Sequence, residues 1–546
     1  MLQCNYRKDV FYMKIREYFK AFFTNVKDGI SRYCIAFICT VLLFLTVSYE
    51  ILFESGTDEI VIPLVMTFSF IALFSVLLKS VQEYLFEKLN ILIQAIVCTL
   101  ASIAGFFLIH THYESLYMIM AYSGIMIALI CFIFFVLMRG ENRDMVFPKL
   151  VSSAIFAFAI CDVLSVGLST CIWAFQSLIF NFTDSYKIYV IVNLLIWTIG
   201  YINIFLSFIP KKDVPTPQSK IFRIFVLFAG LPLYILLIAI LLIYLAKIVV
   251  TWNMPIGEIN WFASFASLFF IFFVLSVTQY KEKFAKLFVK YGGYFLIPVL
   301  VMQAIAVFER INAYGLTTPR TVSLVLILIS ILFIAGAIIK PKYFNTIALA
   351  SGIIVLVVTV TPLNVIDMPV ASQTAILENA LVKNDMLKDG VVIPKENVSK
   401  DDAEIIISAY DYLKHNAKQV PEFIPDSEKS FLQIFGFEWA QFETEYNYQH
   451  CTFKTKDSVD ISGYHQMLRL HGYNDILSFE HNATSYEINI IEVAQALYDQ
   501  YGTDQYELEL YKVNENMALY IEFLYTDIED DLVTNTSFDG YALIKN

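Results

Sequence analysis

The sequence predicts an α-helical polytopic membrane bundle of about 11 transmembrane helices, followed by a soluble α+β domain. Of the 546 residues, 58% are hydrophobic and 16% are charged, and the mean hydropathy is +0.63. A soluble protein of this size could not keep so many apolar side chains out of water. The charges also divide, because residues 1–362 carry 26 Lys and Arg against 18 Asp and Glu, a balance of +8, whereas residues 363–546 carry 12 against 32, a balance of −20. Two different surroundings are implied.

The first 32 residues mix basic and apolar side chains. Seven of them are basic, and aromatic and aliphatic residues are interspersed between the charges. This pattern predicts an amphipathic helix on the inner membrane surface. The first long apolar run begins too late for a cleavable signal peptide, so we expect the first span to be an uncleaved anchor.

Runs of roughly 20 apolar residues can cross about 30 Å of hydrocarbon as helices. Eleven such runs precede residue 363. The fifth is long enough to be one span or a broken one, and the ninth is short. The predicted spans are Tyr33 to Phe53, Ile60 to Leu78, Leu92 to Ile109, Leu116 to Met138, Leu150 to Phe180, Ile188 to Ile209, Phe225 to Val249, Trp261 to Val277, Tyr294 to Phe308, Thr321 to Ile339 and Phe344 to Thr361.

The distribution of basic residues predicts the orientation. With the amino terminus inside, the inward segments up to residue 362 carry 22 basic residues and the outward segments carry 4, as the positive-inside rule requires. An odd number of spans then places the carboxy-terminal domain outside. The predicted parts are a cytoplasmic basic segment (1–32), a transmembrane domain (33–362) and an extracytoplasmic acidic α+β domain (363–546).

A short polar hairpin, residues 308–320, separates the ninth and tenth spans. Gly315 lies where a helix end needs a residue that tolerates the left-handed conformation. Thr318 and Pro319 predict a side-chain cap and a first-turn proline for the next helix. These residues indicate a tight connection between two antiparallel helices.

Two of the four outward basic residues, Arg310 and Arg320, lie in this hairpin. A cation suits the last turn of a helix, where we expect Arg310, but it does not suit the first turn, where we expect Arg320. We hypothesise that both arginines, with Glu309 and Tyr314 beside them, hold an anionic partner. That partner is either an acidic face of the carboxy-terminal domain or a phosphorylated lipid or substrate. The alternative is that both arginines reach lipid headgroups.

The hairpin also resembles the R-I-x-x-Y-G-L-T-x-x-R signature of a bacterial family of polytopic membrane proteins of unassigned function. The resemblance extends from about Phe222 to about Gly390, and a weaker match covers Ile461 to Tyr464. It implies a multi-pass protein of the bacterial cytoplasmic (inner) membrane and no particular activity. The matching residues are Arg310, Ile311, Tyr314, Gly315, Leu316, Thr317 and Arg320, with Leu231 to Tyr234 and Trp252 to Glu258 upstream, whereas Thr318, Pro319 and Thr321 depart from the pattern.

Asp162 places a carboxylate among apolar residues within the fifth span. A charge at the helix centre costs on the order of 2.5–3.5 kcal/mol on insertion scales, so such a group normally faces a cavity or a partner. Gln94, Gln176, Asn193 and Asn203 are the expected partners. Two interpretations stay open: a hydrogen-bonded packing residue, and a step in a proton or cation pathway.

The region after residue 362 has the composition of a water-soluble chain. It contains no nucleophile elbow, zinc-protease motif or phosphate loop, so we predict no catalytic residue. Its histidines are scattered and Cys451 is its only cysteine, so we expect no metal and no cofactor. Helices are expected at Ser372 to Leu387, Asp401 to Leu413 and Glu428 to Phe435, and a β-hairpin at Tyr506 to Tyr511 with Met517 to Phe523.

Three functions are compatible with these observations. The first is a binding, signalling or envelope-associated module with an outer acidic domain. The second is a secondary transporter or channel that uses Asp162. The third is a membrane-embedded transferase that acts on a lipid phosphate. The expected partners are membrane lipids and an anionic ligand or extracytoplasmic protein, and nothing indicates a nucleic acid.

Overall fold

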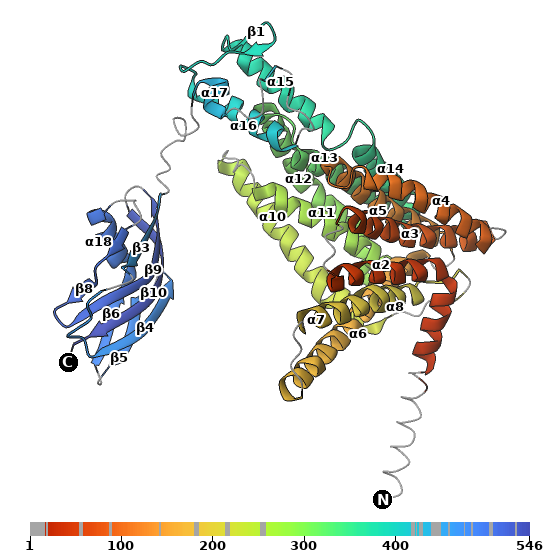
Figure 1. The fold of residues 1–546 in the computed structure, drawn as a ribbon. Coiled ribbons are helices and arrows are strands. Elements are labelled where there is room, and N and C mark those ends of the chain that lie inside the picture. Colours follow the sequence, from red (N-terminus) through yellow and green to blue (C-terminus); the bar gives the residue numbers. More distant parts are fainter. Residues whose placement is uncertain are drawn as a thin grey trace, which may run out of the picture. The chain divides into compact units, whose positions relative to one another are not determined.

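The computed structural model describes residues 17, 20–53, 58–86, 90–140, 143–179, 185–212, 214, 219–251, 258–416, 421, 423–424, 430–437, 449–456, 459–473, 476–481, 484–501, 506–529 and 532–545. The chain forms two compact units. The first comprises residues 1–393 and 405–428, and the second comprises residues 394–404 and 429–546. Figure 1 shows the spanning helices of the first unit in red to green and the strands of the second in blue.

Among the described residues, eleven helices are long and apolar enough to cross a membrane, which confirms the predicted bundle. In hydrocarbon every backbone N–H and C=O must be paired within its own segment, so long apolar runs fold as helices. The spans are α2 (Cys34–Phe53), α3 (Asp58–Tyr84), α4 (Ile91–His110), α5 (Leu116–Leu137), α6 (Arg143–Leu178), α7 with η1 and α8 (Ser185–Leu194, Leu195–Tyr201, Ile202–Ser207), α9 with η2 and α10 (Lys220–Ile224, Phe225–Gly230, Leu231–Thr251), α11 (Glu258–Val277), α12 (Lys283–Tyr314), α13 (Thr318–Ile339) and η3 with α14 (Pro341–Tyr343, Phe344–Val360).

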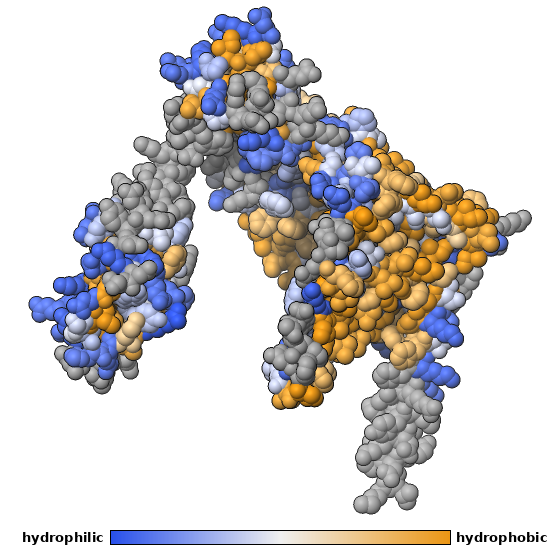
Figure 2. Space-filling model, in the orientation of Figure 1, coloured by the Kyte–Doolittle hydropathy of each residue, from blue (hydrophilic) through white to orange (hydrophobic). Residues whose placement is uncertain are grey.

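The outer face of the bundle is apolar, as lipid contact requires. Figure 2 shows hydrophobic side chains over the face of the helices that it presents. Large apolar side chains such as Leu100, Val163 and Phe228 are more than half exposed. Water would not tolerate so continuous an apolar surface, so this unit is built for a bilayer.

The fifth span is a single helix. The sequence allowed either one span or a broken one here. The structure shows one unbroken helix, α6, which runs over 36 residues from Arg143 to Leu178. Some of its hydroxyl groups bond within the helix, such as Oγ1 of Thr170, which donates to the carbonyl oxygen of Val166 at 2.7 Å, whereas Ser165 donates to Asn193 of α7. Serine and threonine can therefore occupy this helix without breaking it.

The ninth span is longer than predicted, because α12 begins at Lys283 and not at Tyr294. Between these residues apolarity alternates with charge at helical spacing: Ala285 and Phe288 are buried, whereas Lys286 is exposed. An amphipathic turn of this kind is helical but is missed by a search for continuous apolar length.

A π-helical turn interrupts the seventh span. The π-helical segment η2 ends at Gly230, and Pro232 follows in the first turn of α10. Proline has no N–H to donate to the carbonyl four residues earlier, and its ring crowds that carbonyl. The backbone hydrogen bonds of the helix must therefore be rearranged there. The wider π turn accommodates the proline without ending the span.

Two glycines bring α5 and α14 into close contact. A Cβ atom on Gly124 would lie 2.0 Å from Oγ1 of Thr359, and one on Gly352 would lie 2.7 Å from Cε1 of Phe132. Both distances are too short for non-bonded atoms. Small residues let membrane helices approach closely, and the resulting packing holds bundles together in lipid.

The helix α15 (Asp367–Lys383) follows the last span and starts earlier than the predicted Ser372. Its start is set by Asn364, whose Oδ1 accepts hydrogen bonds from the backbone N–H groups of Ile366 at 2.9 Å and Asp367 at 2.7 Å. The helix ends before the predicted Leu387, because Asp385 has a φ of 56° and cannot continue it. The short antiparallel strands β1 (Leu387–Lys388) and β2 (Val391–Val392) come next, and then α16 (Lys400–Asn416).

The second unit contains a largely antiparallel sheet. In its described part, the order is β4-β10-β9-β3-β7, with β8 also paired to β9; β3 and β7 are parallel. The strands β5 and β6 form a separate hairpin, and α18 packs on β10. The elements are α17 (Phe431–Phe435), β3 (Gln449–Thr455), β4 (Gln466–Tyr473), β5 (Ile476–His481), β6 (Thr484–Asn489), α18 (Ile490–Tyr501), β7 (Tyr506–Leu508), β8 (Tyr511–Asn514), β9 (Met517–Glu529) and β10 (Leu532–Ile544).

The predicted hairpin in this unit has the correct turn but the wrong first strand. Residues 514–516 do turn, and the N–H of Asn516 donates to Oδ1 of Asn514 at 2.9 Å. The strand that pairs with β9 is β8, which starts at Tyr511, whereas residues 506–508 pair in parallel with β3. Residues 506–511 alternate between apolar and polar side chains, so the pattern predicts one strand, although residues 509 and 510 separate two short strands. Helix α17 is shorter than predicted; its expected start at Glu428 lies outside the described residues.

Candidate functional site

The connection between α12 and α13 turns at Gly315. This residue is buried and has a φ of +74°, and its N–H donates to the carbonyl oxygen of Ile311 at 2.8 Å. A Cβ atom here would lie 2.1 Å from Cδ1 of Ile376 and 2.9 Å from Nε2 of Gln373, both on α15. Glycine is therefore required both by the backbone conformation and by the approach of α15.

Helix α15 binds the backbone of this hairpin. Nε2 of Gln373 donates to the carbonyl oxygens of Tyr314 at 2.8 Å and Leu316 at 3.0 Å, and Oγ of Ser372 accepts from the N–H of Leu316 at 3.0 Å. Gln373 is only 2% exposed. The end of α12 is thus satisfied by side chains from a helix beyond the last span.

Helix α16 binds the other side of the hairpin, through Thr318. The N–H of Thr318 donates to the hydroxyl of Tyr412 at 3.1 Å, and its Oγ1 donates to the carbonyl oxygen of Val365 at 2.8 Å. The two hydroxyl oxygens are 2.9 Å apart. Because the hydrogen of Thr318 is used on Val365, the Tyr412 hydroxyl must be the donor between them.

The prediction that Thr318 caps α13 is therefore wrong. The helix already includes Thr318, and the preceding Thr317 makes no side-chain cap bond. The side chain of Thr318 is used on Val365, and the first-turn N–H is satisfied from outside by Tyr412. A capping signal in the sequence cannot show that a distant hydroxyl has taken over the same role. Pro319 does lie in the first turn, as predicted.

Both arginines lie at this hairpin. Arg320 donates a hydrogen bond to the carbonyl oxygen of Gly315, and its guanidinium carbon lies 5.9 Å from the centroid of the Tyr314 ring. Arg310 is close enough for the two positive charges to interact. Arg310 was predicted to lie in the last turn of its helix, but it lies before that turn because α12 continues to Tyr314.

No acidic side chain in the described part of the chain pairs with either arginine. Glu309 is exposed and, within those same residues, forms no ion pair with its neighbour Arg310. The arrangement therefore has two cations and an aromatic ring on a rigid backbone, with a hydrogen-bonding surface suited to an oxyanion.

Asp162 lies elsewhere and has none of its expected partners. It is exposed on the outer face of α6, next to Val163, which is 71% exposed. Instead, Gln94 donates to Gln82, and Asn203 donates to Thr40. The other two expected partners, Gln176 and Asn193, bond with Tyr189 and with Ser165 and Ser169. These amides join helices to one another and leave Asp162 facing outward.

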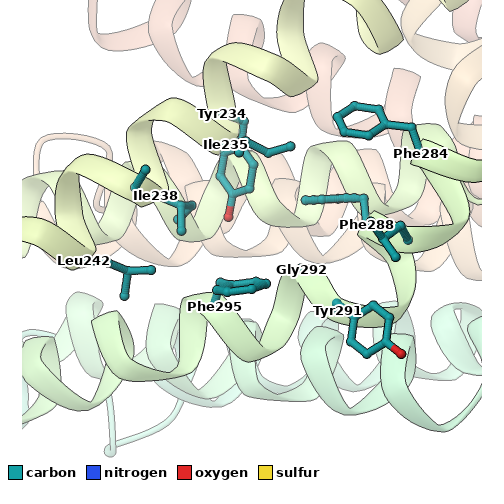
Figure 3. Close-up of a pocket in the computed structure, with 11 residues that line it drawn as sticks. Tyr234, Ile235, Ile238, Leu242, Phe284, Phe288, Tyr291, Gly292 and Phe295 are labelled. Atoms are coloured by element: carbon teal, nitrogen blue, oxygen red, sulfur yellow. The ribbon is translucent and has the colours of Figure 1, made fainter.

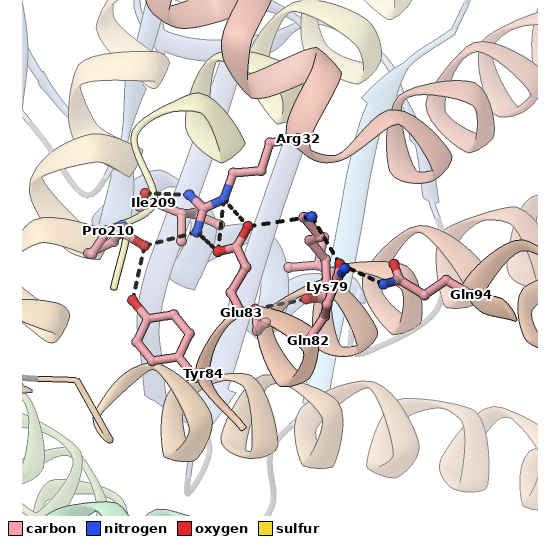
Figure 4. Close-up of polar contacts among 10 residues, drawn as sticks. Arg32, Lys79, Gln82, Glu83, Tyr84, Gln94, Ile209 and Pro210 are labelled. Atoms are coloured by element: carbon pink, nitrogen blue, oxygen red, sulfur yellow. Dashed lines mark hydrogen bonds and ion pairs between the residues drawn. The ribbon is translucent and has the colours of Figure 1, made fainter. Parts of the chain in front are cut away.

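Sequence reasoning missed a second polar cluster, which surrounds Arg32 (Figure 4). Nε of Arg32 donates to the two carboxylate oxygens of Glu83 at 3.0 and 3.2 Å, and its terminal nitrogens donate to the carbonyl oxygens of Ile209 at 2.9 Å and Pro210 at 3.1 Å. The hydroxyl of Tyr84 also donates to Pro210 at 3.2 Å. One guanidinium thereby joins the helix of residues 20–32, α3 and the segment that follows α8.

The environment of Arg32 keeps it charged. Burial opposes the charge, but the hydrogen bonds to Glu83 and nearby negative charge leave the pKa of Arg32 above its usual value. Its side chain is only 7% exposed. Much of the predicted amphipathic segment, residues 1–16, lies outside the described residues. Glu83 at the end of an apolar span was the signal that a cation would be needed nearby.

These features define a polytopic α-helical membrane protein with a hairpin enclosed by two helices that follow its last span. The chain belongs to the family described as a domain of unknown function (DUF4153), whose profile matches residues 21–389. The match ends close to the limit expected at Gly390, but it starts well before Phe222, so the family profile covers the whole bundle from Cys34 to Val360. No curated protein and no solved structure matches the chain.

Proposed function

We propose that this protein is a membrane-anchored binding module in which Arg310 and Arg320 hold an anionic group of a partner. The supporting observation is that two interacting guanidinium groups, without an acidic partner among the described residues, lie on a backbone fixed from both sides. Holding two cations together is unfavourable unless an anion is bound between or beside them. Tyr314 offers an aromatic face to the same group.

The hydrogen bonds of α15 and α16 to the hairpin would transmit a conformational change on binding to the rest of the chain. Any shift of Tyr314 or Thr318 on binding would strain the hydrogen bonds to Gln373 and Tyr412. Both partners belong to helices that lead toward the carboxy-terminal region. A binding event at the membrane surface would therefore reach that region, which is the behaviour of a signalling module.

We place the protein in the bacterial cytoplasmic membrane, with the amino terminus inside and the hairpin outside. The ratio of 22 inward to 4 outward basic residues supports this orientation. In this orientation the acidic residues 363–546, with a balance of −20, share a compartment with both arginines. The anion is a carboxylate of this region or a phosphate of a lipid headgroup, and the experiment distinguishes the two sources.

Transport has weaker support. A carboxylate in a conduction path faces a cavity or the bundle interior, whereas Asp162 is exposed on the outer face of α6. The cavity that lies between α10 and α12 does not include Asp162. Transfer chemistry on a lipid phosphate has the two arginines available, but in the described part of the chain no nucleophile with an adjacent base lies beside them.

The experiment replaces both arginines with glutamine, which keeps hydrogen-bonding capacity and removes charge. Charge-assisted hydrogen bonds contribute about 1.5–3 kcal/mol each, so loss of two should weaken binding more than tenfold. Lys247→Gln, another exposed outward cation, is the matched control. Limited proteolysis measures the rate of cleavage within residues 363–546, and native mass spectrometry measures retained phospholipid.

The two measurements separate the sources of the anion. Faster cleavage of the double variant with unchanged lipid retention assigns a carboxylate of the carboxy-terminal region. Lower lipid retention with unchanged cleavage assigns a headgroup phosphate. If the double variant and Lys247→Gln match the wild type in both measurements, the proposed function is wrong.

A further inference from the structure

A second site lies in the membrane bundle, away from the hairpin, as a cavity of about 260 Å³ between α10 and α12. Figure 3 shows its walls: Tyr234, Ile238 and Leu242 come from α10, and Phe288, Tyr291 and Phe295 come from α12. The cavity is larger than the roughly 150 Å³ at which an engineered apolar cavity already binds benzene. It is therefore large enough to hold part of a hydrocarbon chain.

The cavity is elongated along both helices. On α12 its lining extends from Phe284 to Phe295, which at about 1.5 Å per residue corresponds to roughly 16 Å. This length matches one half of a hydrocarbon core of about 30 Å. A single extended acyl chain from one leaflet fits such a slot better than a compact ligand does.

Tyr234 places a buried hydroxyl beside this apolar space. Tyr234 is 4% exposed, and its hydroxyl has no hydrogen-bond partner among the residues described. The ring is held by Phe273, at 5.4 Å between centroids, and by Phe288, at 5.7 Å and nearly perpendicular. In Figure 3 its oxygen points toward the space between α10 and α12, where neighbouring atoms cover it. A buried hydroxyl without a partner is unfavourable, so the cavity is suited to an occupant that carries an acceptor oxygen.

Positive charge lies along the amino-terminal half of the α12 wall. Lys283, Lys286 and Lys290 are exposed and recur on one stripe of α12, beside the stripe that lines the cavity. Nζ of Lys290 lies 4.8 Å from the centroid of the Tyr291 ring, which is part of the wall. Within the described residues, no acidic side chain pairs with these lysines. Lysine stems on a helix lean toward its amino-terminal end and reach the membrane surface there.

We propose that this cavity holds one acyl chain of an anionic phospholipid. The chain lies along Ile238, Leu242 and Phe295, and the Tyr234 hydroxyl donates to an ester carbonyl oxygen of the lipid. The headgroup phosphate meets Lys283, Lys286 and Lys290. The apolar slot would hold the acyl chain, the Tyr234 hydroxyl the ester group and the three lysines the phosphate. These groups follow one another in the same order in the lipid.

The test uses the full-length protein, freed of lipid in detergent and mixed with phosphatidylglycerol or with phosphatidylcholine of the same acyl chains. Native mass spectrometry measures the bound lipid. Ala239 lines the cavity, so Ala239→Trp fills it. Ala246 is exposed on the same face of α10 but does not line the cavity, so Ala246→Trp is the matched control.

The wild type and Ala246→Trp should each retain one tightly bound phosphatidylglycerol, and Ala239→Trp should lose it. Tyr234→Phe, which keeps the ring, should release the lipid at lower collision energy. Lys283→Gln/Lys286→Gln/Lys290→Gln should lose the preference for phosphatidylglycerol over phosphatidylcholine. Equal retention by the two tryptophan variants, or an unchanged lipid preference in the lysine variant, would overturn the proposal. Tyr234→Phe removes a single unpaired oxygen, so it keeps the test decisive if Ala239→Trp does not fold.

Discussion

The side-chain amide of Gln373 donates a hydrogen bond of 2.8 Å to the carbonyl oxygen of Tyr314, so a helix beyond the last span holds the end of α12. The same amide nitrogen donates to Leu316 at 3.0 Å, and Gln373 is nearly inaccessible. Two backbone acceptors of the hairpin therefore depend on one side chain, and the geometry of the candidate site depends on them.

Replacing Gln373 should loosen the hairpin measurably. In Gln373→Ala the carbonyl oxygens of Tyr314 and Leu316 lose their partner, which should cost about 1–3 kcal/mol and lower the thermal unfolding midpoint in detergent. Asn379→Ala, an exposed amide on the same helix, is the control and should leave the midpoint unchanged. Equal midpoints for the two variants would mean that α15 does not hold the hairpin.

Substitution of Gly315 should destabilise the protein for two separable reasons. Its backbone has a left-handed conformation, and its Cα lies close to Ile376 of α15. A side chain at a positive φ costs about 1–2 kcal/mol, and a Cβ here also meets Cδ1 of Ile376. Gly390 has a similar φ of +75° with nothing near its Cβ position, so Gly390→Ala measures the conformational cost alone. Gly315→Ala should therefore destabilise the protein more than Gly390→Ala does.

The contact at Gly315 can then be isolated. Ile376→Val removes the Cδ1 atom that the new Cβ would meet. In a double-mutant cycle, Ile376→Val should recover part of the loss in Gly315→Ala, measured by chemical unfolding in detergent. Strict additivity of the two substitutions would show that α15 does not approach the hairpin as described.

The spans could be predicted because a bilayer leaves an apolar segment of this length one stable form, the helix. The ends of the elements could not, because they depend on side chains from elsewhere. Asn364 sets the start of α15, and Tyr412 satisfies the first turn of α13 from almost a hundred residues away.

The candidate site was predictable only in part. Gly315 and the two arginines stand out from their surroundings because glycine and cations are unusual between two apolar helices. Gln373 does not stand out, because a glutamine in an amphipathic helix is ordinary and its burial appears only once α15 packs on the hairpin. Arg32 was likewise interpreted as one more surface cation, since its contacts with Glu83 and Pro210 come from distant parts of the chain.

The ion pair of Arg32 should be important for stability. Arg32→Gln would leave the carboxylate of Glu83, 23% exposed, with only the longer contact to Lys79 at 3.7 Å, at a cost of about 2–4 kcal/mol. Arg143→Gln is the control, because its contact with Asp144 is exposed on both sides and should contribute less than about 1 kcal/mol. In the double variant Arg32→Gln/Glu83→Gln, the thermal unfolding midpoint should recover part of the decrease seen in Arg32→Gln. If Arg32→Gln and Arg143→Gln lowered the midpoint equally, the structural role of Arg32 would be contradicted.

The contribution of Arg32 should not vary around neutral pH. Folding raises the pKa of its guanidinium, so the stabilisation is fully present below the unfolded pKa and is lost only as pH rises through the still higher folded value. Both values lie far above neutrality. The difference in unfolding midpoint between wild type and Arg32→Gln should therefore be the same at about pH 6 and about pH 9. A difference that shrinks across this interval would assign the stabilisation to another group.

Asp162 provides the last prediction, because it is exposed on α6 and has no hydrogen bond or ion pair within the described residues. An unpaired carboxylate within a span opposes insertion by on the order of 2.5–3.5 kcal/mol, so Asp162→Leu should leave the thermal midpoint unchanged or raise it, and should increase the yield of inserted protein. Asp367→Leu is the contrasting variant, since the Asp367 carboxylate accepts a hydrogen bond of 2.6 Å from Asn364 at the start of α15, and its loss should lower the midpoint. A lower midpoint for Asp162→Leu would instead show that another chain or ion pairs with Asp162 in the membrane, and transport through that partner would then regain support.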